Sequence, residues 1–201
     1  MAWLSVKSAI PSGDIVFDYI IESLLFNCPS CTKKAPKNGK NGDKGKTIYR
    51  PVSVRNNTFR SRGITGNYLK IVSAQLKKEL PDKTHFVLIK NDDMVINVLS
   101  GIENSSSMAD SLFEVIVAQR RTDMSDSEAI YYYIRNAFAH GSFEVVSKSN
   151  ERIYILESSN KGVVKARMRL KESTLKKYCQ ISQIRRSDLE KLQDKKNKRK
   201  R

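Results

Sequence analysis

The stretch Ser125–Phe143, which reads SDSEAIYYYIRNAFAHGSF, has the most informative pattern in the chain. Ser125 or Ser127 can cap the start of a helix, and the acidic residues beside them suit the positive end of its dipole. Gly141 is a typical residue just beyond a helix end. The stretch therefore predicts a helix from about Asp126 to His140.

The predicted helix has an apolar side and a polar side. At about 100° per residue, the apolar side chains fall on one arc, which we expect to face the core. These residues are Ile130, Tyr133, Ile134, Ala137 and Phe138. Arg135, Asn136 and His140 fall on the other side, and Tyr132 lies one turn before Asn136. In a plainer interpretation, His140 only caps carbonyls or lies at the surface.

The polar residues of this helix also match a short family motif. Arg135 and Asn136, three further residues and then His140 resemble the R-polar-x3-H motif of the HEPN superfamily. These are the nucleotide-binding helical domains of prokaryotes and higher eukaryotes. The aromatic-rich helix before the motif and Gly141 directly after it fit the resemblance.

The resemblance implies a fold, an activity and a set of residues. It implies a bundle of four or five helices and a homodimer that shares a metal-independent endoribonuclease site, with no cofactor. Arg135, Asn136 and His140 would be catalytic, with Tyr132 as a supporting neighbour. The products would be a 2′,3′-cyclic phosphate and a 5′-hydroxyl. Members of the family often act as toxins or in phage defence, sometimes beside an antitoxin or regulator.

The side chains themselves suit the cleavage of RNA. An imidazole titrates near neutrality and can deprotonate the 2′-hydroxyl or protonate the leaving oxygen. A guanidinium stays charged and directs two N–H donors at phosphate oxygens. An amide can hold the imidazole tautomer or bind phosphate. One chain offers only His140 on this face, so two proton-transfer groups are more easily assembled from a two-fold dimer.

The charge of the chain points to a polyanionic partner. The formal net charge is +16, and most of it lies in residues 33–50 and 195–201. Such runs bind nucleic acid through counterion release, although a solubilising tail and a disordered loop need no partner. We expect a single domain over 1–194, with a mobile basic insertion at about 32–50 and a disordered tail at 195–201.

Hydrophobic periodicity predicts a mainly α fold, a helical bundle with a small C-terminal β-hairpin. The resemblance implies that this bundle is of the HEPN type. The predicted helices cover about 14–26, 65–80, 92–99, 108–121 and 126–140, and the hairpin strands cover 152–157 and 163–170.

Two groups of basic residues are predicted to bind RNA. Arg55, Arg60 and Arg62 alternate with aromatic residues, which suits stacked bases or phosphate but equally suits an exposed turn. Lys165, Arg167 and Arg169 share one face of a predicted strand at period two, as charged residues often do on an exposed sheet.

The number of cysteines and the hydropathy of the chain indicate its cellular compartment and whether it binds a metal. Cys28, Cys31 and Cys179 are too few for a disulfide framework, and a single CxxC lacks the further ligands that zinc requires. No secretory signal and no apolar run of membrane-spanning length is visible. We therefore expect a cytoplasmic protein without a bound metal.

Two other functions compete with the ribonuclease. One is a non-catalytic module that binds nucleic acid through the basic segments. The other is an interaction or inhibitor protein in which the motif helix is only a dimer interface. RNA cleavage that depends on His140 would distinguish the first hypothesis from both.

Overall fold

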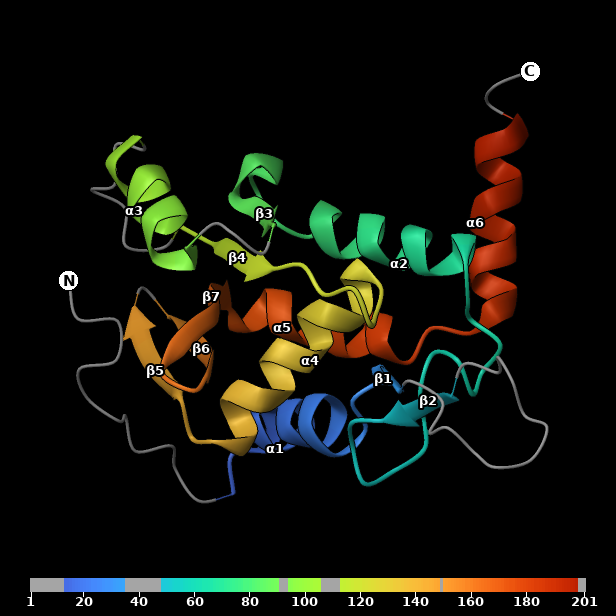
Figure 1. The fold of residues 1–201 in the computed structure, drawn as a ribbon, viewed down its shortest axis with the longest axis horizontal. Helices are drawn as coiled ribbons and strands as arrows, with labels where there is room; N and C mark the ends of the chain where they lie inside the picture. Colours follow the sequence, from blue (N-terminus) through green and yellow to red (C-terminus); the bar gives the residue numbers. More distant parts are fainter. Residues whose placement is uncertain (1–12, 35–47, 91–93, 106–112, 149, 199–201) are drawn as a thin grey trace, which may run out of the picture.

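The structure is a computed structural model that describes residues 13–34, 48–90, 94–105, 113–148 and 150–198. Over these ranges the protein has a mixed α/β fold (Figure 1). Its helices are α1 (Ile15–Ile21), continued by the π-helix η1 (Glu22–Phe26), then α2 (Asn67–Lys78), the 3-10 helix η2 (Lys83–His85), α3 (Val95–Ser105), α4 (Asp126–Ala139), α5 (Glu172–Ser182) and α6 (Arg186–Lys198). Its strands are β1 (Cys31–Lys34), β2 (Ile48–Pro51), β3 (Phe86–Ile89), β4 (Val115–Gln119), β5 (Phe143–Lys148), β6 (Glu151–Asn160) and β7 (Val163–Lys171).

The prediction of a mainly α, HEPN-type bundle was wrong, because the protein contains a five-stranded sheet in addition to its helices. The strand order is β3-β4-β7-β6-β5, with β3 and β4 parallel and the other pairs antiparallel. The predicted hairpin of β6 and β7 was confirmed, but it is the middle of this larger sheet and not an appendage. Strands β1 and β2 form a separate antiparallel hairpin.

The largest error concerns β4, which was predicted as part of a helix over 108–121. Four consecutive residues of β4, from Val115 to Ala118, are completely buried. Val115 and Val117 pack in the smaller core cluster with α3, whereas Ile116 and Ala118 pack in the main cluster with α4. A strand buried on both faces reads as a continuous apolar run, and periodicity alone does not separate such a run from a buried helix.

The helices lie on both faces of the sheet. Helix α4 crosses one face and packs against β6, α2 and η1, and α5 lies on the same face (Figure 1). Helix α3 covers the opposite face at β4 and β7. The candidate site lies where the C-terminal half of α4 meets the last residues of β4 and β6 and the first residues of β7.

The remaining predictions had mixed outcomes. Helices near 14–26, 65–80 and 126–140 were confirmed as α1 with η1, α2 and α4. The ends of the predicted basic insertion pair as β1 and β2, and its middle, 35–47, lies outside the described residues. Helix α6 continues to Lys198, so the first part of the predicted disordered tail is helical, and 199–201 lie outside the description. Among the described helices, none has the length and hydropathy that crossing a bilayer requires.

Candidate functional site

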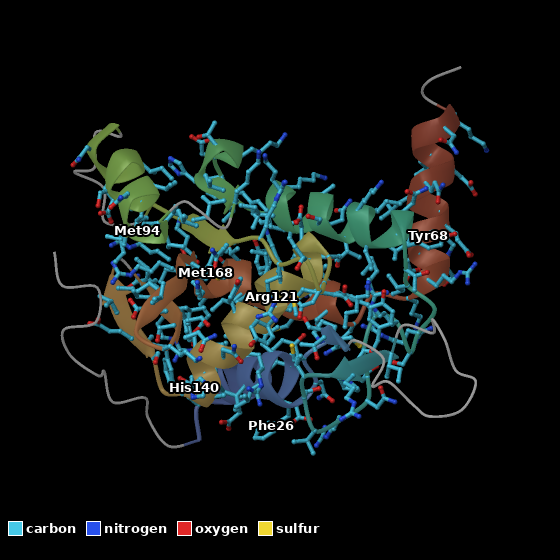
Figure 2. The ribbon with its side chains drawn as sticks, in the orientation of Figure 1. Phe26, Tyr68, Met94, Arg121, His140 and Met168 are labelled. Carbon is cyan, nitrogen blue, oxygen red and sulfur yellow. The ribbon has the colours of Figure 1, made fainter. Side chains whose placement is uncertain are left out.

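One side of α4 lines a cleft of about 340 Å³. Tyr132, Asn136 and His140 reach the cleft from successive turns of the helix. His140 lies at the end of α4 (Figure 2). Its side chain is exposed, whereas Tyr132 and Asn136 are half-buried. The cleft therefore brings together three of the four residues predicted on this helix face.

The end of α4 holds His140 in a defined position. His140 is the C-terminal cap residue, and its backbone N–H donates to the carbonyl of Asn136 at 3.0 Å. Gly141 has φ +63° and Ser142 N–H donates to the Ala137 carbonyl at 2.8 Å, which together form a Schellman motif. The start of the helix is fixed as firmly, because Ser125 and Glu128 form a capping box.

The other walls of the cleft are polar and carry an excess of positive charge. They come from the segment that follows β4, from the end of β6 and from β7. The lining residues from these segments are Gln119, Arg120, Arg121, Thr122, Asp123, Ser158, Ser159, Asn160 and Lys165. Three basic side chains, from Arg120, Arg121 and Lys165, thus line the same cleft as the His140 imidazole, with one carboxylate, that of Asp123. This excess of positive charge favours an anionic ligand.

A β-bulge directs Lys165 into the cleft. Ser158 pairs with Ala166 and Ser159 with Val164, so Lys165 is the extra residue that has no partner in the register. Val164 packs on the α3 side of the sheet, whereas Ala166 packs on the α4 side. The bulge therefore reverses the alternation of side chains along β7 and turns Lys165 toward α4. Within the described part of the chain, Lys165 forms no ion pair.

The two arginines that follow β4 differ in how firmly they are held. Arg121 donates from Nε and Nη2 to Asp123, at 2.9 and 2.7 Å, and lies over the Tyr132 ring with Cζ 4.3 Å from its centroid. This carboxylate raises the pKa of Arg121 above its ordinary value, so the guanidinium is charged at any relevant pH. Arg120 is more exposed than Arg121, and its Nη2 lies 3.6 Å from the Asp126 carboxylate, which is a longer contact than those of Arg121 with Asp123.

Tyr133 lines the cleft but is not suited to proton transfer. Burial raises its pKa to about 12, and its hydroxyl donates to the Gln119 carbonyl at 3.0 Å. The hydroxyl is therefore held as a donor that joins α4 to the end of β4. Among the described residues of the cleft, His140 contributes the imidazole, the side-chain type that most often transfers protons in catalysis.

Arg135 does not line the cleft with the rest of its motif. Its Nη1 donates to Oδ1 of Asn136 at 3.2 Å, and its Nε is buried without a hydrogen-bond partner among the described residues. Arg135 therefore reaches the cleft only through Asn136.

Most of the arginines predicted to bind RNA are engaged inside the protein. Arg55 pairs with Glu22 at the surface, and Arg60 forms two hydrogen bonds with the buried Glu128 at 2.9 and 3.0 Å. Arg62 donates to backbone carbonyls at residues 58, 182 and 184, at 2.6 to 3.2 Å. A phosphate would have to displace these contacts.

The strand face predicted to bind RNA is divided by the bulge. Arg167 pairs with Glu157 at 2.7 Å. Arg169 is 8% exposed and lies over Phe113, with Cζ 4.9 Å from the ring centroid. Of the three residues predicted to share this face, only Lys165 contributes to the cleft.

The sequence reasoning missed Arg120, Arg121 and Asp123. A signal was present, because these polar residues directly follow the apolar run of β4, and the carboxyl ends of strands in α/β sheets are common binding positions. The assignment of the run to a helix concealed that signal. No group of three or more metal-ligating side chains occurs in the ranges that the structure describes.

Compared with protein-family models, curated proteins and solved structures, the chain matches none of them.

Proposed function

We propose that this protein is a metal-independent endoribonuclease that cleaves RNA by attack of the 2′-hydroxyl on the neighbouring phosphate. The observation that carries the proposal is the cleft in which an exposed His140 faces Arg120, Arg121 and Lys165. The proposal does not depend on the helical bundle that the HEPN resemblance implied. It depends on an imidazole and several cations that converge on one space large enough for a nucleotide.

The proposed step is a transesterification within the RNA. The His140 imidazole accepts the proton of the 2′-hydroxyl, and the 2′-oxygen forms a bond to phosphorus. The bond from phosphorus to the 5′-oxygen breaks, and that oxygen takes a proton from a second group. Lys165, which has no ion pair among the described residues, is the best-placed cation to stabilise the charge on the phosphate oxygens. The products are a 2′,3′-cyclic phosphate and a 5′-hydroxyl.

The second proton-transfer group is proposed to be His140 of a second copy. Ala139 and His140 are both exposed, so the end of α4 is accessible to another protomer. A two-fold axis near this end would place two imidazoles beside one phosphodiester. We further propose a cytoplasmic location, which agrees with three buried and unpaired cysteines, and a role as a growth-arresting toxin or defence effector under a separate regulator.

The His140→Ala variant tests the proposal directly. We expect it to bind single-stranded RNA with little change but to lose cleavage, assayed with EDTA present, by at least the roughly hundredfold typical of a missing general base. His140 is exposed and its ring makes no hydrogen bond within the described residues, so the variant should fold normally. Unchanged cleavage in His140→Ala would end the proposal.

A non-catalytic RNA-binding domain is the second candidate. Within the described part of the chain, no side chain hydrogen-bonds to the His140 ring. A general base is usually oriented by such a bond, so this observation favours the second candidate. This candidate predicts that wild-type protein binds RNA with strong salt dependence and that prolonged incubation yields no cyclic phosphate product.

A further inference from the structure

Arg121 and Tyr132 form a stack inside the cleft that the cleavage step does not use. The guanidinium lies 4.3 Å from the ring centroid of Tyr132, and Asp123 holds its edge with two hydrogen bonds of 2.9 and 2.7 Å. Figure 2 shows Arg121 beside the middle of α4, with His140 at the end of the same helix. The Tyr132 ring and the Asp123 carboxylate therefore both hold the guanidinium of Arg121 in place.

This arrangement suits a base better than a phosphate. Asp123 occupies the Nε–Nη2 edge of Arg121, which is one of the two edges through which a guanidinium forms parallel bonds to an oxyanion, and its carboxylate offsets the charge of the guanidinium. The side chain of Arg121 is 27% exposed, and a base that stacks on the guanidinium plane would not displace the two bonds to Asp123. Planar guanidinium groups stack on nucleobases in RNA-binding proteins.

The size and the rim of the cleft agree with a single nucleotide. Its volume of about 340 Å³ is near the lower end of the range for ligand pockets, which begins at roughly 300 Å³. Ser158, Ser159 and Asn160 also line the cleft, and their hydroxyl and amide groups can donate to or accept from the edge of a base. A base reaches such a space only when it is unpaired.

We infer that Arg121, supported by Tyr132 and Asp123, is the stacking platform of a subsite for one unpaired nucleobase of the RNA, next to the phosphate that is cleaved. The inference rests on the proposed function, because it names how that site selects its substrate. Arg121 is then a specificity-determining residue, and single-stranded RNA is the substrate class.

Chimeric oligonucleotides test this subsite. In each oligonucleotide a single nucleotide carries a 2′-hydroxyl and all others are 2′-O-methylated, so cleavage has one possible position. Two further versions lack the base either at that nucleotide or at the next one. The enzymes are wild type, Arg121→Lys and, as the matched control, Arg120→Lys, which changes the neighbouring arginine of the same cleft.

We expect wild type to cleave one of the abasic versions on the order of tenfold more slowly, as the loss of one stacked base predicts. Arg121→Lys should cleave the intact oligonucleotide at that reduced rate and lose nothing further on the abasic version. Arg120→Lys should keep the preference of the wild type. Equal cleavage of all versions by wild type would overturn the inference. So would an Arg121→Lys variant that cleaves the intact and the abasic version more slowly than wild type by the same factor.

Failure of the proposed function is distinguishable from failure of this inference. If wild type cleaves none of the oligonucleotides, fluorescence anisotropy measures their dissociation constants instead. A base preference in Kd that disappears in Arg121→Lys supports the subsite without catalysis, whereas equal Kd values overturn it.

Discussion

Arg135 donates a hydrogen bond from Nη1 to Oδ1 of Asn136 at 3.2 Å, and only Asn136 of the two lines the cleft. This bond orients the amide, and the N–H₂ of Asn136 provides two further donors at the cleft. We propose that Arg135 positions the side chain of Asn136, whereas the sequence suggested direct contact with phosphate.

The coupling of these two residues is measurable with a double-mutant cycle. We expect Arg135→Met and Asn136→Ala to lower kcat by a similar factor, because both remove the oriented amide. The double variant should lose little more than either single variant, and KM should change less than kcat. Additive losses in the double variant would instead mean that Arg135 acts on the substrate by itself.

Lys165 is expected to carry one phosphate contact. The Lys165→Met variant should bind single-stranded RNA more weakly and lower the slope of log Kd against log salt by about one unit, which corresponds to one ionic contact. Lys161→Asn is the matched control, because it removes the same charge in the adjoining turn, where φ is +49° and asparagine is tolerated. An equal fall in slope for both variants would mean that only net charge matters.

The ion pair between Arg60 and Glu128 is expected to contribute more to the free energy of unfolding than the exposed pair between Arg55 and Glu22. Glu128 is fully buried and accepts two hydrogen bonds from Arg60, so Arg60→Met leaves a buried carboxylate without its cation. We expect the free energy of unfolding to fall by about 3–5 kcal/mol. Arg55→Met, which breaks the exposed pair with Glu22, should cost about 1 kcal/mol or less. Urea denaturation of the two variants measures the difference.

The cap of α1 should make the stability depend on pH in acid. Hydrogen bonds from Arg152 and from the first turn of α1 lower the pKa of Asp14 from 3.8 to about 2. Because the folded pKa is the lower one, the stabilisation is complete above about pH 4 and is lost as the pH falls toward 2.

The Asp14→Asn variant isolates this contribution, since asparagine still caps a helix but does not titrate. Thermal unfolding of wild type between pH 4 and pH 2 should show a steeper loss of Tm than unfolding of the variant. Parallel curves would show that Asp14 does not contribute to acid unfolding.

Much of the local structure was predictable, because it depends on neighbours in the chain. The capping residues and Gly141 located α4 correctly, and the apolar arc of α4 is buried as the periodicity indicated. The turn after Asn160 and the alternation in β6 and β7 predicted that hairpin. Segment β4 was assigned wrongly, because its burial on both faces removes the alternation that marks a strand.

The site residues illustrate the same division. Tyr132, Asn136 and His140 were found by helical spacing alone, since one helix presents them together. Arg121, Asp123 and the hairpin residues come from separate elements and meet only when the sheet forms. Lys165 was identified as a cation, but its direction depends on a bulge that period-two reasoning does not include.

By itself, the sequence determined the extent of α4, the stripe of Tyr132, Asn136 and His140, and the excess of positive charge, because each of these depends on the order of residues within a short segment. Only the tertiary structure decided that β4 is a central strand, that Arg135 lies behind Asn136, and that Arg121 and Lys165 join His140 around one cleft. These outcomes depend on which distant segments pack against each other and bury their apolar surface from water. Such packing leaves no distinctive periodicity in the sequence of any single segment.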